Sequence, residues 1–338
     1  MLKQNKAHKI LCNAGINIEK SDILSIKEHP ESTYNYVHRI NTKNKDYILK
    51  EAKKELKSKE FRSIKLNHIK RLETDSCVSD LFRIILGKEI IPQIYYYKKE
   101  KPTILMHAFE GHMLKEDLLN GIIDNEILYK IGKILGKLHS STYKVFSESH
   151  YLFENNQNRE EELKTHYIAI AKVTQENLSN KILELGELHR KRKLCVIHGD
   201  LTSKNIIIDN GNIHLIDFEL SHLGSPEYDL GHFLPEYFLA AVGMNKPSPN
   251  IDKFFEAYFS EFINIPDEEK NHIKKNALKH SAVIMLFRLE GMAKTDFLDS
   301  NSREKIYNFI KNHLEKNNFE KGIDEELINQ CRDEICKI

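Results

Sequence analysis

The order of apolar and polar positions divides the chain into two regions. In the first hundred residues, short segments rich in Ile, Val and Tyr alternate with polar turns, which is typical of β-strands. A charged segment with helical spacing of Leu56, Ile64, Leu66 and Ile69 interrupts them. The strands expected from this pattern cover residues 22–28, 34–40, 46–50, 93–97 and 103–107.

After Gly111 the apolar positions follow a helical period. Helices are expected over residues 127–139, 160–188 and 273–297, and a strand-rich island over 194–218 interrupts them. The pattern therefore predicts an α+β protein with two lobes. A small, mostly β N-terminal lobe would comprise residues 1–107, and a larger, mostly α C-terminal lobe would comprise residues 108–338.

Composition restricts the class of partner. The 51 Lys+Arg and 50 Asp+Glu residues give a formal net charge of +1, whereas nucleic-acid binders usually carry a clear basic excess. The basic run at residues 189–193 has no interleaved aromatic residues and is read as a surface turn. We therefore expect no nucleic-acid partner.

The sequence also indicates a cytoplasmic protein without a membrane partner. No apolar run approaches the roughly 18–20 residues of a membrane-spanning helix, and the N-terminus lacks a signal-peptide core. The 5 cysteines are widely spread and favour free thiols. The 17 histidines include no HExxH and no Cys/His quartet, so a structural zinc site is not expected.

The strand-rich island carries the candidate chemistry. A buried-type strand runs into His198-Gly-Asp200, and Asn205 follows five residues after Asp200. Two apolar strands then flank Asn210-Gly211, a pair that accepts the positive φ angles of a tight hairpin. Because the second strand ends at Asp217, we expect the hairpin to fold Asp217 back beside Asp200 and Asn205.

Two carboxylates and a carboxamide are the groups that phosphoryl transfer requires. One Asp orients the attacking hydroxyl and accepts its proton, while an Asp and an Asn hold Mg²⁺ against the phosphates. Asp200 takes the first role in this interpretation, and Asn205 and Asp217 are the metal ligands. Lys204 is either a cation beside the transferred phosphate or a solvated loop lysine.

The order of these motifs resembles that of a known family. Residues 198–205 (HGDLTSKN) resemble the HxDxxxxN catalytic loop of kinase-like folds, and residues 216–219 (IDFE) resemble their metal-binding motif. Residues 104–111, 135–139 and 224–230 resemble further segments of the aminoglycoside phosphotransferase and choline kinase-like family. The resemblance covers roughly residues 22–233 and implies a bilobal protein kinase-like fold. In this interpretation His198 braces the catalytic loop and Asp229 anchors it.

The resemblance implies ATP and Mg²⁺ as cofactors and places the phosphate contacts in the N-terminal lobe. Lys50, at the end of a strand, resembles the lysine that pairs with the α- and β-phosphates. Its expected partner is a helix carboxylate, Glu60, with Glu55 as the second choice. Both could instead be solvated partners of neighbouring lysines.

The remaining nucleotide contacts leave weaker traces. A phosphate loop is expected near residues 31–35, where no GxGxxG occurs. The hydroxyls of Ser32 and Thr33 would do part of the work of backbone amides, together with Asn35. Residues 104–111 resemble the hinge between the lobes, and adenine would be bound there by backbone groups of Met106, His107 and Phe109.

The predicted function is ATP- and Mg²⁺-dependent phosphorylation of a hydroxyl on a small molecule. Aminoglycosides (and hence antibiotic resistance), choline or ethanolamine, methylthioribose and homoserine are acceptors that the resemblance offers. A protein kinase is disfavoured because only a dozen residues separate Asp217 from Asp229 and no A-P-E follows. A catalytically inactive nucleotide-binding pseudokinase and a metal-dependent hydrolase using His198, Asp200 and Asp217 remain alternatives.

Charge along the chain favours a cationic acceptor. Residues 1–107 carry +9 and residues 108–338 carry −8, so a polyanionic nucleotide suits the first region and a cation the second. The helical C-terminal region should supply the acceptor pocket. Its candidate residues, chosen by segment, are Glu227, Glu236, Tyr258, Arg288 and Glu290. The oligomeric state is not predicted.

Overall fold

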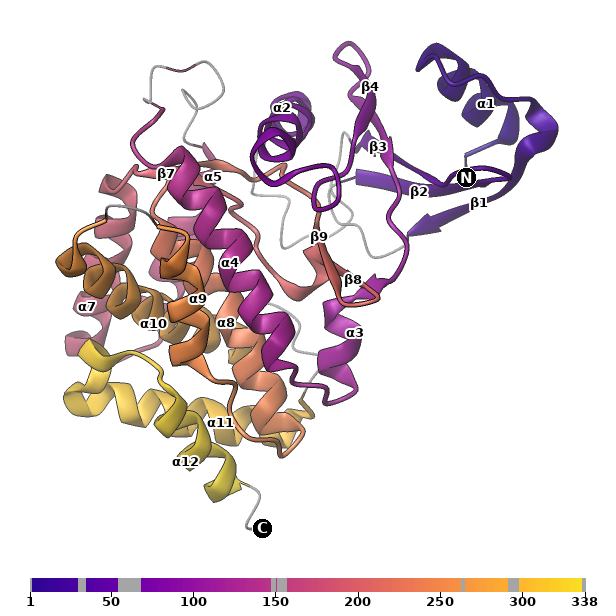
Figure 1. The fold of residues 1–338 in the computed structure, drawn as a ribbon. Helices are drawn as coiled ribbons and strands as arrows, with labels where there is room; N and C mark the ends of the chain where they lie inside the picture. The colour runs from indigo at the N-terminus through magenta and orange to yellow at the C-terminus, as the bar shows by residue number, and fades with distance from the viewer. Residues whose placement is uncertain are drawn as a thin grey trace. The chain divides into compact units, whose positions relative to one another are not determined.

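The computed structural model describes residues 2–29, 35–53, 68–146, 150, 157–262, 265–290 and 298–335 (Figure 1). The chain forms two compact units. The first unit comprises Met1–Gly111 with Ile207–Ser221, and the second comprises His112–Ile206 with His222–Ile338. The sequence analysis placed the boundary after residue 107 and assigned 207–221 to the larger lobe. The contacts of that segment explain the difference, as described below.

The first unit is built on a five-stranded antiparallel sheet. Its strand order is β1-β2-β3-β5-β4, and each of the expected strands is confirmed within one or two residues at each end. The bounds are β1 (Ile23–His29), β2 (Asn35–Thr42), β3 (Tyr47–Ala52), β4 (Ile94–Lys98) and β5 (Thr103–His107).

One helix covers each face of this sheet (Figure 1). Helix α1 (Gln4–Asn13), which the sequence analysis did not predict, contributes Leu11 to the apolar cluster that contains Leu49 and Leu105 of the sheet. Helix α2 (His68–Leu86) packs through Leu72 on the opposite face. The expected helical segment from Leu56 onward is described only from His68. Because side chains alternate along β3, Lys50 lies on the face that α2 covers.

The hairpin predicted at Asn210-Gly211 is confirmed. It joins β8 (Ile206–Asp209) to β9 (Asn212–Leu215), and both turn residues have positive φ, 48° and 77°. The Leu215 amide donates to the Ile90 carbonyl at 2.9 Å. The His214 ring nitrogen Nδ1 lies 2.6 Å from the carbonyl oxygen of Glu89. These bonds explain why residues 207–221 belong with the first unit.

The second unit is mostly helical around one buried helix, α8 (Pro226–Gly243), which packs along α10 (Asp267–Leu289). Strand β7 (Cys195–Ile197) pairs antiparallel with β10 (His222–Gly224), and the short β6 spans His112–Met113. Within the residues that the structure describes, no helix is long and apolar enough to cross a membrane. The other helices are α3 (Leu114–Leu119), α4 (Asn125–Thr142), α5 (Gln157–Glu162), α6 (Ala169–Ala171), α7 (Glu176–Lys191), α9 (Ile251–Ser260), α11 (Ser300–His313) and α12 (Glu325–Ile335).

The single helix expected over residues 160–188 is wrong. After α5 the chain forms a π-helical segment, η2 (Leu163–Ile168), then the short α6, and the helix stops before α7. The Thr174 hydroxyl donates to the carbonyls of Ile170 and Ala171, which satisfies the end of the first segment. Gln175 is extended, with ψ 153°, and begins α7. The helical period continued across this break, so the pattern did not reveal it.

Candidate active site

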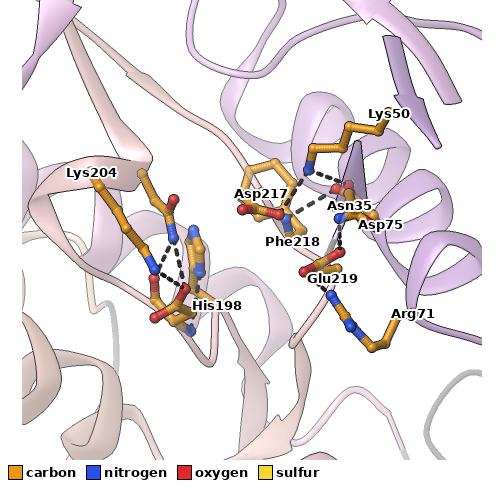
Figure 2. A network of polar contacts seen from close by, with 11 residues as sticks. Asn35, Lys50, Arg71, Asp75, His198, Lys204, Asp217, Phe218 and Glu219 are labelled. Atoms are coloured by element: carbon orange, nitrogen blue, oxygen red, sulfur yellow. Dashed lines mark hydrogen bonds and ion pairs between the residues drawn. The ribbon is translucent and has the colours of Figure 1, made fainter. Parts of the chain in front are cut away.

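In the first unit, Lys50 lies between two carboxylates (Figure 2). Its Nζ is 2.7 Å from Asp75 Oδ2 and 2.7 Å from Asp217 Oδ1, and the residue is only 6% exposed. Burial alone would lower the pKa of Lys50. The charges of Asp217, Asp75 and Glu219 outweigh that effect and raise the pKa, so Lys50 is a firmly protonated cation.

The helix carboxylate that pairs with Lys50 is Asp75, on α2. Asp75 is fully buried, and its Oδ1 also accepts a hydrogen bond from the Phe218 amide at 3.0 Å. It therefore joins β3, α2 and the segment that follows β9. The sequence analysis missed Asp75 and named Glu60 and Glu55, which lie outside the described residues. Asp75 lies in a buried polar row on α2 with Arg71 and Ser79, at i, i+4 and i+8, but nothing in the sequence shows which acidic residue reaches Lys50.

Glu219 is the second charged centre of the first unit. It forms an ion pair with Arg71 of α2 and accepts a hydrogen bond from Asn35 Nδ2 at 2.6 Å (Figure 2). The Asn35 side chain, expected at the phosphates, thus holds Glu219. Ser32 and Thr33, the other expected phosphate contacts, lie outside the described residues.

Asp217 has an unusual backbone conformation. Its φ is 72°, in the left-handed region that non-glycine residues seldom adopt. The next residue, Phe218, is buried edge-on against Phe82 of α2, with ring centroids 5.1 Å apart. The packing of Phe218 and the hydrogen bond from its amide hold the turn, and the Asp217 side chain remains 30% exposed. Such strained positions cluster at functional sites.

The hinge segment has backbone groups that already bind protein atoms. Met106 pairs with Ile48 and with Ile94 in the sheet. The His107 amide donates to the Gln93 carbonyl at 2.8 Å, and the Phe109 carbonyl accepts from Arg39 Nη1 at 3.1 Å. Recognition of adenine by Met106, His107 and Phe109 stays a prediction.

In the second unit, the loop over residues 198–205 brings Asp200, Lys204 and Asn205 together. Asn205 Nδ2 donates to the Asp200 carbonyl at 2.8 Å and to its carboxylate Oδ2 at 3.1 Å. Lys204 Nζ lies 3.1 Å from the same Oδ2, and the Asp200 side chain is 23% exposed. The Asp200 carboxylate is therefore oriented by two neighbours and still reaches the surface.

Asp229, in the first turn of α8, fixes the beginning of this loop. Its carboxylate accepts from the His198 amide at 2.7 Å and the Gly199 amide at 3.0 Å, and it lies 3.1 Å from His139 Nε2. Burial would raise the pKa of Asp229, but the bond and charge of His139 outweigh it and lower the pKa. Asp229 is therefore the loop anchor, as predicted. His198 Nδ1 accepts from the Asp200 amide at 3.3 Å, which agrees with a bracing role.

Glu236 fixes the other end of the same loop. Its Oε2 accepts from the Ser203 amide at 2.5 Å, and its Oε1 lies 2.8 Å from Arg288 Nη1. Glu236 is seven residues after Asp229, so both project from one face of α8. One helix thus clamps both ends of the loop that carries Asp200. Arg288 and Glu236, two of the candidate acceptor contacts named from the sequence, are therefore paired with each other.

Most of the residues chosen as acceptor contacts bind other protein groups. Glu227 pairs with Arg192 at 2.7 Å and is fully buried. The Tyr258 hydroxyl lies 3.0 Å from His139 Nδ1 and is also buried. Together with the Glu236–Arg288 pair, these contacts are structural.

Asp217 and Asn205 have the chemistry that magnesium requires. Mg²⁺ prefers carboxylate and carbonyl oxygens, and Asp217 keeps a partly exposed carboxylate. Because the Asn205 amide nitrogen is engaged by Asp200, the carbonyl Oδ1 is the atom with which Asn205 would hold a cation. Each of the two residues, within its own unit, therefore offers an oxygen that suits a hard divalent ion.

Residues 25–269 match the phosphotransferase enzyme family. The chain belongs to this family. A curated relative, the LicA homolog of Metamycoplasma hominis, is 28% identical over 193 residues, which cover 54% of this chain and 66% of that protein. The chain thus spans just under two thirds of the relative's length.

Two solved structures show that the chain has a bilobal protein kinase-like fold. Choline kinase from Cryptosporidium parvum is similar with a TM-score of 0.57 at 17% identity, covering 94% of this chain and 98% of that one. The amicoumacin kinase hAmiN is similar with a TM-score of 0.58 at 13% identity, covering 96% of this chain and 99% of that one.

Proposed function

We propose that the chain is an ATP- and Mg²⁺-dependent kinase that phosphorylates a hydroxyl of a small molecule. The observation that carries this proposal is the position of Lys50, 2.7 Å from a helix carboxylate and 2.7 Å from Asp217. In kinases, a lysine tied to a helix carboxylate holds the α- and β-phosphates, and an aspartate near it binds the metal. A binding module without catalysis would not need the oriented Asp200 in addition.

The reaction is direct, in-line transfer. Asp200 orients the acceptor hydroxyl and accepts its proton, while the bond between the γ-phosphorus and the β,γ-bridging oxygen breaks and ADP leaves. Lys50 holds the nucleotide phosphates, and Lys204 offsets charge that develops on the transferred group. Asn205 and Asp217 are the ligands for Mg²⁺, which supplies neutralisation of the phosphate charge when bound.

The acceptor in this proposal is a small cation, such as an amino alcohol or an aminoglycoside. The net charge of −8 over residues 108–338 supports it, since that region carries Asp200. Two proteins of the same fold are described as a choline kinase and an amicoumacin kinase, and the latter was solved with AMP-PNP and Ca²⁺. Methylthioribose and homoserine serve as the uncharged and zwitterionic alternatives.

A coupled ADP-release assay against these acceptor classes tests the proposal. We expect Mg²⁺-dependent turnover with a cationic acceptor, and loss of turnover in Asp200→Asn with ATP affinity retained in calorimetry. Asp252→Asn, which changes an exposed aspartate on α9, is the matched control and should keep full activity. Undiminished turnover in Asp200→Asn would overturn the catalytic assignment. ATP binding without turnover across the whole panel would favour the pseudokinase alternative.

A further inference from the structure

Three buried residues of the second unit, none of them in the loop over residues 198–205, have ligand atoms close to one another. Glu162 ends α5, His189 lies in the last turn of α7, and His222 begins β10. Glu162 Oε2 is 3.1 Å from His189 Nε2 and 3.4 Å from His222 Nε2. The three residues are 8%, 0% and 3% exposed, and their ligand atoms all lie within 4.8 Å of one another.

These separations match those in a transition-metal site. Bonds of about 2.0–2.2 Å from a zinc ion to nitrogen and oxygen ligands, at tetrahedral angles, place neighbouring ligand atoms about 3.3 Å apart. The observed 3.1 Å and 3.4 Å lie on either side of that value. Two imidazoles and one carboxylate are a donor set that suits zinc and its neighbours in the first transition series.

The surroundings of the cluster resemble those of bound metals. A histidine that binds a metal through one ring nitrogen usually has a hydrogen-bond partner at the other. His189 Nδ1 lies 3.3 Å from the hydroxyl oxygen of Ser225, which precedes α8. In addition, the buried Glu162 Oε1 has no hydrogen-bond partner among the described residues. A buried carboxylate oxygen without a partner is costly, and a bound cation would offset that cost.

One buried positive charge, that of Arg159, acts on Glu162 and His189. Arg159 is 2% exposed beside the cluster, and its Nη1 donates to the Leu223 carbonyl at 3.2 Å. This hydrogen bond ties the Arg159 guanidinium to β10.

We propose that Glu162, His189 and His222 bind one structural Zn²⁺ ion, with water as the fourth ligand. Because β10 pairs with β7 through His222–Ile197 and Leu223–Val196, the ion would tie α5 and α7 to the strand that leads into His198 and Asp200. This site is separate from the Mg²⁺ ligands and does not depend on the proposed kinase activity. The sequence concealed it, because 27 and 33 residues separate its successive ligands, which lie on three different elements.

The first experiment measures metal in the intact, tag-free chain. Elemental analysis after dialysis should give about one zinc per chain, and Co²⁺ exchanged into the site should show the intense visible absorption of tetrahedral cobalt. A strong chelator should lower the melting temperature, and added Zn²⁺ should restore it. A chain that carries no stoichiometric metal, takes up no Co²⁺ and melts at the same temperature with chelator would overturn the proposal.

Variants assign the ligands. Glu162→Gln and His222→Gln retain side-chain size and hydrogen bonding but remove a strong ligand, so zinc affinity should fall at least about tenfold. His280→Gln is the matched control, because His280 is fully buried and its ring lies 5.8 Å from that of His189, outside the cluster. It should keep its zinc. Zinc affinity equal to that of the unmodified chain in both ligand variants would contradict the assignment, and if a variant does not fold, the chelator result on the unmodified chain decides.

Discussion

At the scale of single residues, the candidate site depends on buried charges that each have a partner. Lys50 is balanced by Asp75 and Asp217, and Glu219 is paired with Arg71. Removing one member of a buried pair is far more damaging than removing an exposed one, because it leaves the other charge desolvated. The stability of the first unit should therefore depend on Lys50.

Replacing Lys50 by Met tests this expectation. The substitution keeps an unbranched chain of similar length but leaves Asp75 and Asp217 uncompensated, which should reduce the free energy of unfolding by about 3–5 kcal/mol. Lys6→Met is the control, since Lys6 forms an exposed ion pair with Glu51 at 2.6 Å. Loss of an exposed pair costs about 0–1 kcal/mol. Urea unfolding of the two variants measures the difference, and equally small losses would contradict the role given to Lys50.

The same residues show what a sequence can predict. Lys50, Asp200, Asn205 and Asp217 could be named as candidates because each stands at a fixed distance from a strand end or a turn. Asp75 was not, because it lies 25 residues from Lys50 along the chain. Only the packing of α2 against the sheet selects it among many acidic residues. Contacts made across the fold leave no local spacing to detect.

At the scale of elements, α8 organises the loop that carries Asp200. Asp229 and Glu236, on one face of this helix, accept hydrogen bonds from backbone amides near both ends of the loop over residues 198–205. The strands that carry Lys50 and the hairpin before Asp217 were predictable from alternation and from Asn-Gly. The break before α7 was not predictable, because helical periodicity does not mark where a helix stops. Helix α1 was not predictable either, because a short amphipathic helix resembles a polar N-terminal segment.

Asp229→Asn should disturb this loop without changing side-chain volume. An amide has one acceptor oxygen where the carboxylate has two, so its NH₂ group would face a backbone N–H. We expect a loss of about 2–3 kcal/mol in the free energy of unfolding at neutral pH, together with a fall in kcat. Asp124→Asn is the matched control. Asp124 caps α4 at the surface by accepting from Glu126 and Ile127, and Asn caps a helix equally well. Similar effects of the two substitutions would contradict the anchoring role.

At the scale of the whole molecule, the fold class could be predicted from the change of periodicity at Gly111. Which residues belong to each unit could not be predicted in this way. Residues 207–221 belong with the sheet of the first unit because Leu215 and Asp217 bind there. No pattern within the segment indicates which unit it joins. Among the described residues of the second unit, several histidines are buried, and their protonation affects the stability of the molecule.

Acidification should destabilise the protein well above the pH at which carboxylates titrate. Burial lowers the pKa of His232 and of His280 to about 3, and it lowers the pKa of His166 well below its usual value. In the unfolded chain these rings take up protons near pH 6.5, so stability falls as the pH decreases. Each should cost about 1.4 kcal/mol between about pH 7.5 and 5.5. Urea unfolding at both pH values measures the loss, which should be about 1.4 kcal/mol smaller in His280→Gln. Equal losses in the variant and the unmodified chain would show that His280 takes up a proton in the folded state.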